Sequence, residues 1–195
     1  SGEITNLPYL QQIGSFGKPV ILSSGMANLS EIESAIRVLE ISGTDRSQIT
    51  VLHCTTEYPA PMREVNLKAM LTIANSLKID VGYSDHTPNL VNPIAATALG
   101  AKVIEKHFTI NRTLPGPDHR MSLEPEELIN TVKLVRDTEL ALGNSIKEVL
   151  ESEKENRVKL RKSIVTTMDI EKNAVIKRNM LAIKRPGDGI PPSEI

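Results

Sequence analysis

The segment "IDVGYSDHT", residues 79–87, combines a nearly continuous apolar run with three polar side chains at its end. Such runs are typical of strands covered on both faces of a parallel sheet. Ser84, Asp85 and His86 stand where this strand ends. A strand that only had to stop would use turn residues such as Gly or Asn. The segment therefore predicts a buried strand that ends at the edge of an active site.

Three further apolar runs occur on either side of this segment. They are "PVILSS" at residues 19–24, "ITVLHC" at 49–54 and "KVIEKHF" at 102–108. The runs are rich in Val and Ile, which favours strands over helices of the same length.

Helical patterns lie between these runs. Residues 32–39 carry apolar side chains at helical spacing, and Ser30 with Glu33 predicts a capping box at the start of that helix. An Ala-rich stretch, residues 93–99, predicts a second helix, and Pro125 fits the first turn of a third. Strand and helix therefore alternate, which is typical of the βα units of a parallel α/β fold.

The number of strands leaves two architectures open. A closed barrel of eight βα units needs roughly 250 residues, whereas this chain has 195 and shows four such strands. Either four units precede Ser1, where the chain begins without an initiator Met, or the sheet is open and doubly wound. No glycine-rich phosphate loop follows any strand, which argues against nucleotide-binding open sheets.

The composition and the residue pattern of the sequence change after the last predicted helix. We expect the α/β part to cover residues 1–145 and a charged linker to cover residues 146–162. Residues 163–195 contain short β-like runs, a turn at Lys172-Asn173 and a tail rich in Pro and Gly. They predict a second, small β-rich domain that is truncated at Ile195.

Composition excludes several classes of function. The net charge is −1 with no basic block, so we expect no nucleic-acid partner. No apolar run is long enough to cross a bilayer, so we expect no membrane partner. The single cysteine, Cys54, excludes an internal disulfide framework and favours a reducing, cytoplasmic location.

Polar side chains gather at the carboxyl ends of the predicted strands, which meet at one mouth in a βα barrel. His86 and His107 could ligate a divalent metal from neighbouring strands, with Asp85, Glu105 or Asp118 as a further or outer ligand. The alternative is that these histidines only hydrogen-bond loops. The full set of strand-end residues is Ser23, Ser24, His53, Cys54, Thr55, Ser84, Asp85, His86, Glu105 and His107.

The segment "TLPGPDHRMSLEPEEL", residues 113–128, follows the last strand. Pro115, Gly116 and Pro117 predict a rigid loop that would hold Asp118 and His119 over the mouth. A plain turn that leads to a helix capped near Ser122 or Glu124 is the alternative. His53 and Cys54 are sequence neighbours on a strand, so they should face opposite sides and not form a nucleophile–base pair.

Eight motifs, in this order along the chain, resemble the sialic acid synthases, which include N-acetylneuraminate synthase and its legionaminic and pseudaminic acid relatives. They are "SGEITNLPYL", "VILSSGM", "LHCTTEYP", "GYSDHT", "IEKHFT", "PGPDH", "SLEP" and "IKRPGDG". The resemblance implies a (βα)8 TIM barrel, of which about the last four βα units are present, followed by an antifreeze-like (SAF, β-clip) domain. It also implies a domain-swapped homodimer, in which that domain caps the partner's barrel.

The implied reaction joins phosphoenolpyruvate to an N-acetylated amino sugar, N-acetylmannosamine or a diacetamido analogue. The products are a nine-carbon sialic-acid-type sugar and phosphate. Family members carry a catalytic carboxylate and phosphate-binding lysines on the first four strands. Residues 1–195, which lack those strands, should therefore not catalyse the reaction alone. The nearest rival is another metal-dependent phosphoenolpyruvate or aldol condensing barrel. A binding protein such as an ice binder is disfavoured by the many charges of residues 161–185.

The resemblance also implies roles for individual residues. His86 and His107 would ligate Mn²⁺ or Mg²⁺, with Asp118 beside the metal's water and Glu105 lining the substrate site. Arg185 would reach the N-acetyl group of the sugar in the partner's site. The residues that would contact phosphoenolpyruvate are Ser1, Ser23, Tyr58, Ser84 and, where some members have Asn, Thr56. Asn173 stands where the small domain usually has Gly in a turn, and Asn tolerates the left-handed conformation nearly as well.

Overall fold

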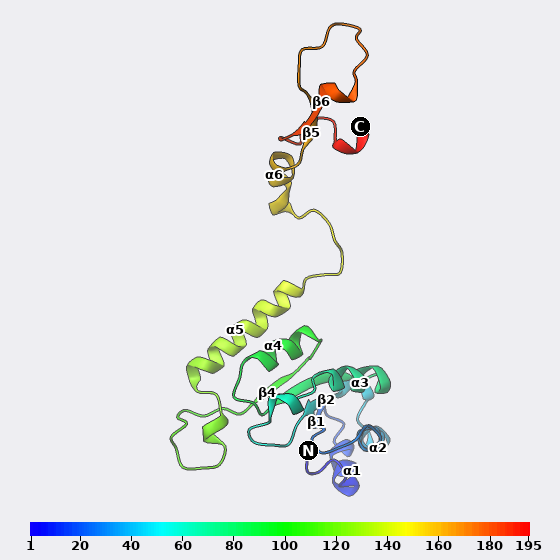
Figure 1. The fold of residues 1–195 in the computed structure, drawn as a ribbon. Coiled ribbons are helices and arrows are strands. Elements are labelled where there is room, and N and C mark those ends of the chain that lie inside the picture. Colours follow the sequence, from blue (N-terminus) through cyan, green and yellow to red (C-terminus); the bar gives the residue numbers. More distant parts are fainter. The chain divides into compact units, whose positions relative to one another are not determined.

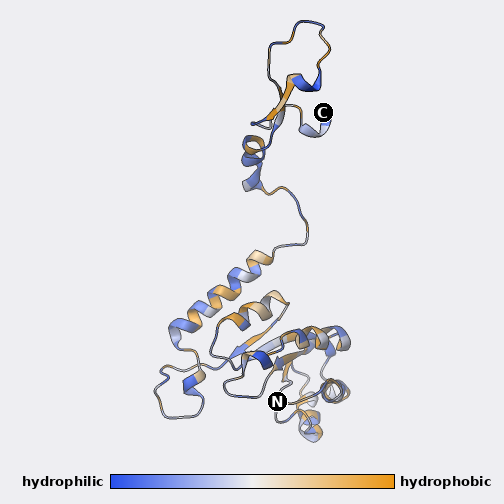
Figure 2. Ribbon diagram, in the orientation of Figure 1, coloured by the Kyte–Doolittle hydropathy of each residue, from blue (hydrophilic) through white to orange (hydrophobic).

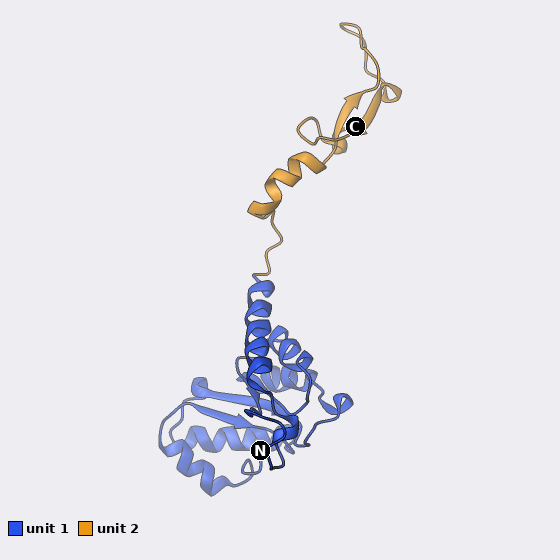
Figure 3. Ribbon diagram, turned by 90° about the vertical axis from the view of Figure 1, so that its left-hand side faces the viewer, with its two compact units in different colours: residues 1–143 blue, residues 144–195 orange.

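The structure is a computed structural model that describes residues 1–195 as two compact units, residues 1–143 and 144–195 (Figure 3). None of its helices combines the length and the apolar character that crossing a membrane requires. The division lies close to the expected end of the α/β part, and each unit is described by itself below.

Unit 1 is built on a four-stranded parallel sheet with the order β1-β2-β3-β4 (Figure 1). The strands are β1 (Val20–Ser23), β2 (Ile49–Cys54), β3 (Asp80–Asp85) and β4 (Ile104–Lys106). Each of the four apolar runs therefore forms a strand, as predicted, and the order in the sheet follows the order in the chain.

Helices connect and flank these strands. They are α1 (Leu7–Ser15), α2 (Leu29–Ser42), α3 (Lys68–Leu77), α4 (Val91–Ala98) and α5 (Pro125–Leu142). Short 3-10 turns of three residues each lie at Arg46–Gln48, Met62–Glu64, His119–Met121, Arg178–Met180 and Pro192–Glu194. Strands that follow one another in a parallel sheet need such crossover helices, and the result is a curled half-barrel of α/β type.

The start of α2 differs from the prediction. The capping box joins Asn28 to Glu31, not Ser30 to Glu33: the Asn28 side chain accepts from the Glu31 N–H, and the Glu31 carboxylate accepts from the Asn28 N–H. Because the helix begins at Leu29, Ser30 is already in its first turn, and its hydroxyl donates to the Asn28 side chain. The predicted pair was two residues too late.

The start of α5 agrees with the prediction. Pro125 occupies the first turn, and Glu124 forms a capping box with Glu127.

The two faces of the sheet have different roles, because side chains alternate along a strand. The helix face, represented by Val51, Val81 and Tyr83, is buried in the core formed with the helices. We call the opposite side, which carries Cys54 and Ser84, the inner face. The core gives unit 1 its stability, and the inner face is left for the polar residues at the strand ends.

The outer edges of the sheet have no strand partner. β1 pairs only with β2, and β4 pairs only with β3. Ile21 on β1 remains 58% exposed, although parallel strands are normally covered on both faces. Four strands thus form an open arc rather than a closed barrel.

Unit 2 contains helix α6 (Glu151–Leu160) and an antiparallel pair, β5 (Ser163–Thr166) and β6 (Leu181–Lys184). α6 lies within residues 146–162, the expected linker, and it buries no residue. Its residues are mostly hydrophilic by hydropathy (Figure 2). Asn173 has φ 69°, so it adopts the left-handed conformation that the sequence suggested.

Candidate active site at the carboxyl ends of the strands

His86 and His107 come together just beyond the ends of β3 and β4. Their ring centroids are 5.4 Å apart, and the rings meet edge to face at 87°. Ser84 and Glu105 lie two residues before the two histidines and are register partners in the sheet. The Ser84 hydroxyl donates to Glu105 Oε1 at 2.6 Å. Four predicted site residues therefore form one cluster on the inner face.

The orientation of the buried His86 ring is fixed. Its Nδ1 lies 2.6 Å from the Thr55 carbonyl, which only accepts, so Nδ1 carries the proton. Nε2 lies 3.4 Å from the Ser84 hydroxyl, whose single hydrogen is directed to Glu105. The lone pair of Nε2 is therefore free of a donor and available to a ligand.

The loop after β4 brings Asp118 to His107. The Asp118 carboxylate lies 3.8 Å from His107 Nδ1. The loop is anchored at Arg112, whose N–H donates to Glu124 Oε1 and whose Nε donates to the Ser122 carbonyl, both at 2.9 Å.

His119, the other predicted residue of this loop, contacts Thr109. Its Nδ1 lies 2.7 Å from the Thr109 hydroxyl. We infer that His119 braces the loop, whereas Asp118 belongs to the candidate site.

Tyr58 lies against both histidines. Its ring centroid is 4.3 Å from that of His86 and 5.6 Å from that of His107. Partial burial raises the pKa of Tyr58, and its proximity to Cys54, Asp118 and Glu105 raises it further. The phenol therefore stays protonated at neutral pH and can donate a hydrogen bond.

A second group of residues, here called the hydroxyl cluster, consists of Ser1, Ser23, Cys54 and Thr56. Ser23 Oγ lies 2.9 Å from Ser1 Oγ and 3.0 Å from Cys54 Sγ. Thr56 Oγ1 is buried and has no hydrogen-bond partner. Buried hydroxyls are rarely left unpaired, so this oxygen marks a place that suits a polar ligand.

Gly25 keeps the hydroxyl cluster open. A Cβ added at this position would lie 2.0 Å from Thr56 Oγ1 and 2.6 Å from Ser1 Oγ. Any larger residue would push these oxygens apart. The structure thus brings together Ser1, Ser23 and Thr56, which the sequence analysis named as substrate contacts.

Two strand-end residues do not face this site, because they lie on the helix face. Asp85 pairs with Lys106 at 2.7 Å and accepts from the Tyr83 hydroxyl at 3.1 Å, so it is not a ligand for a metal near His86. His53 has its Nε2 2.7 Å from the Val65 carbonyl.

Lys106 was missed as a candidate. Its position directly before His107, on the opposite face of β4, was the only signal in the sequence.

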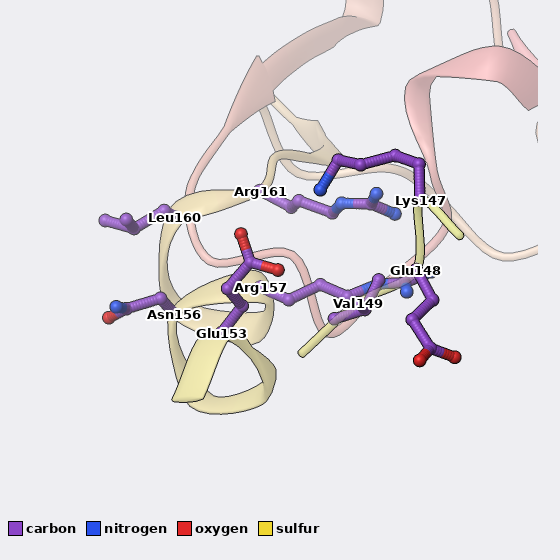
Figure 4. A pocket seen from close by; sticks show the side chains of 8 residues that line it. All are labelled: Lys147, Glu148, Val149, Glu153, Asn156, Arg157, Leu160 and Arg161. Atoms are coloured by element: carbon purple, nitrogen blue, oxygen red, sulfur yellow. The ribbon is translucent and has the colours of Figure 1, made fainter. Parts of the chain in front are cut away.

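Arg185 follows β6 in unit 2 and is exposed. The role expected for it remains a prediction. A hollow of ≈ 700 Å³ in the same unit lies between α6 and residues 147–149 (Figure 4). It contains no predicted site residue, and all its lining side chains are exposed. It is therefore not a candidate active site.

The inner-face residues were tested as a metal site. No three side chains of the types His, Cys, Asp and Glu lie close enough together to hold an ion by themselves. Two imidazoles do converge, and the one at His86 has the tautomer that a metal ligand needs, set by a carbonyl as in known metal sites. This arrangement fits a cation that takes its remaining ligands from water or substrate.

Several known proteins have sequences similar to that of this chain. The chain is 53% identical over 190 residues to N,N'-diacetyllegionaminic acid synthase of Campylobacter jejuni, a match that covers 97% of this chain and 57% of that protein. It is 35% identical to human N-acetylneuraminate-9-phosphate synthase, with 100% of this chain and 54% of that protein covered. The chain thus spans little more than half the length of these relatives.

A solved structure agrees with these matches. The crystal structure of N-acetylneuraminic acid synthetase from Leptospira borgpetersenii superimposes with a TM-score of 0.72 at 36% identity. The match covers 79% of this chain and 53% of that one. The model of the NeuB family matches residues 1–147, which include every residue of the candidate site. With the half-barrel, the strand-end cluster and these relatives in agreement, the chain belongs to the NeuB family.

Proposed function

We propose that this chain is part of a synthase that joins phosphoenolpyruvate to an N-acetylated amino sugar, and that it carries about the last four βα units of the barrel. The observation that carries the proposal is the convergence of His86 and His107 beside Ser84, Glu105 and Asp118. Membership of the NeuB family and the names of the relatives support the same chemistry.

The proposed reaction forms one carbon–carbon bond. The enol carbon of phosphoenolpyruvate attacks the aldehyde carbon of the open-chain sugar, and the aldehyde oxygen becomes a hydroxyl after it takes a proton. Water adds to the cationic carbon that bears the phosphate ester and gives up a proton. The carbon–oxygen bond to phosphate then breaks, so that inorganic phosphate and the 2-keto acid are released.

The residues of this chain bind and orient the reactants. The hydroxyl cluster would donate hydrogen bonds to anionic oxygens of phosphoenolpyruvate, and the orphaned Thr56 hydroxyl would find its partner there. Glu105 accepts from Ser84 and faces the same space, where it would line the sugar site. Asp118 would accept a proton from the attacking water, because it stands beside His107 at the open side of the cluster.

His86 and His107 would hold a divalent cation, Mn²⁺ or Mg²⁺. When bound, the cation would polarise the aldehyde oxygen as a Lewis acid. The free Nε2 lone pair of His86 supports this assignment.

For the small unit we propose an antifreeze-like domain. Its antiparallel β5–β6 pair is followed directly by Arg185, which would reach the sugar's N-acetyl group in the site of a second copy. This proposal includes a homodimer of the full-length protein.

The sugar is proposed to be a diacetamido hexose rather than N-acetylmannosamine. Two matched relatives, at 53% and 47% identity, are named N,N'-diacetyllegionaminic acid synthase, whereas the human N-acetylneuraminate-9-phosphate synthase is 35% identical.

Phosphate release by the full-length protein tests the reaction. With phosphoenolpyruvate, Mn²⁺ and a diacetamido hexose we expect release at a higher kcat/KM than with N-acetylmannosamine. Gly25→Ala is expected to raise the KM for phosphoenolpyruvate, because its Cβ would crowd the hydroxyl cluster. Gly2→Ala, whose Cβ would meet no atom within 4 Å, is the matched control. No release with any N-acetylated sugar would reject the proposed function.

A further inference from the structure

β3 and β4 are joined across their ends by two side-chain pairs, one on each face of the sheet. Ser84 and Glu105 pair on the inner face, and Asp85 and Lys106 pair on the helix face. Both are direct register partners, so each pair spans the same gap between the two strands. His86 and His107 are the next residues along the chain after the second pair.

The Asp85–Lys106 pair is buried. The side chain of Asp85 is 0% exposed and that of Lys106 is 5% exposed, with 2.7 Å between Nζ and Oδ2. Every other ion pair between Lys or Arg and a carboxylate in this structure has side chains that are at least 31% exposed. A buried pair is a poor source of net stability compared with apolar side chains, so its place between two metal-ligand candidates calls for another role.

The pair also holds the backbone on both sides of His86. Asp85 Oδ1 accepts from the N–H of Thr87 at 2.9 Å and from its hydroxyl at 2.8 Å. The Thr87 carbonyl accepts from Lys106 Nζ. Residues 85 and 87 are therefore tied to β4 through one lysine, and the imidazole between them cannot shift without breaking these bonds.

We propose that the Asp85–Lys106 ion pair is a positioning clamp that sets the spacing of the His86 and His107 rings, and thereby the affinity of the site for a divalent cation. The inference rests on the proposed metal site. Neither residue touches the cation; each acts through the histidine that follows it in the chain. Lys106 supplies the cross-strand bond, and Asp85 passes the constraint to the turn that carries His86.

Binding of Mn²⁺ alone to the full-length protein tests this proposal, measured from the EPR signal of free Mn²⁺ without substrate. The double variant Asp85→Asn/Lys106→Met removes both charges and keeps the side-chain volumes, so no charge is left unpaired in the core. We expect its Kd for Mn²⁺ to rise about tenfold or more, the usual effect of losing an outer support of a metal ligand. Thr87→Val removes one donor to Asp85 and the hydroxyl that accepts from Asn92 but keeps the ion pair, so it should raise the Kd by a smaller factor.

The control for removing an ion pair away from the site is Glu40→Gln/Arg46→Met, at a pair that is more exposed than Asp85–Lys106. Glu40 is on α2 and Arg46 is in the turn that leads into β2, so their ion pair, at 2.9 Å, lies near the amino ends of the strands. Removing it should not change the Kd for Mn²⁺. A role confined to stability would lower the unfolding midpoint and leave the Kd of the folded protein unchanged. A wild-type Kd for Mn²⁺ in the double variant therefore overturns the clamp.

His86→Ala separates this result from a failure of the metal site itself. If the wild type binds Mn²⁺ and His86→Ala does not, the metal site stands and the double variant decides the clamp. If His86→Ala binds Mn²⁺ as the wild type does, the proposed metal site and the clamp are both refuted.

Discussion

Lys106→Met should cost unit 1 a large part of its stability, because it leaves the Asp85 charge without its partner. Breaking a buried ion pair by removing one member costs about 3–5 kcal/mol. In this site Asp85 Oδ1 still accepts from the Tyr83 hydroxyl and from both Thr87 donors, and only Oδ2 loses its partner. We therefore expect the lower end of that range, about 3 kcal/mol.

Urea unfolding of the full-length protein, followed by circular dichroism, measures this loss. Asp85→Asn/Lys106→Met should recover most of it, because no buried charge remains unpaired in the double variant. A single-variant loss below about 1 kcal/mol, or a double variant no more stable than the single one, would refute the reasoning.

Three further predictions concern the sheet, the last helix and the histidines. Gly82→Ala should destabilise unit 1 by about 1–3 kcal/mol in urea unfolding, because its Cβ would lie 2.5 Å from the Val103 carbonyl oxygen; an unchanged midpoint would contradict the close approach of these segments. Glu127 accepts from a backbone N–H at Glu124, which lowers the pKa of its carboxyl below 4.5. Its contribution is therefore present above that pH and lost as the pH falls through the lowered pKa, so that Glu127→Gln should cost about 0.5–1 kcal/mol at neutral pH and nothing in acid. His86→Ala and His107→Ala should each abolish phosphate release while the circular dichroism spectrum stays unchanged, and normal turnover in either variant would remove the metal assignment.

Much of unit 1 can be predicted from hydrophobic patterning. The four apolar runs form the four strands, because a run of branched residues that is covered by helices has few alternatives. Strand ends in such a sheet point to one side, which is why His86 and His107 could be expected to meet. The capping residue was harder to predict. Asn28 and Ser30 can each begin a capping box, and only the position at which the helix starts shows which of them does so.

The face on which a strand-end residue lies was harder to predict. Asp85 looked like a further ligand because it stands next to His86, but alternation along β3 turns it to the helix face. The position of Lys106 directly before His107 was too weak a signal to mark it as functional, since a lysine in a strand usually indicates an exposed edge. Its burial depends on Asp85, which is a contact between residues far apart in sequence, and no local pattern reveals such a pair.

The alternation of the two faces has a practical consequence for directed evolution. At the ends of β3 and β4, positions 84 and 105 face the candidate site and positions 85 and 106 face the core. A saturation library that aims to change the accepted sugar should vary the first two positions and leave the other two as they are. A library that aims for thermal tolerance should leave all four positions as they are, because changes at positions 85 and 106 would break the buried ion pair that is proposed to set the spacing of the two histidines.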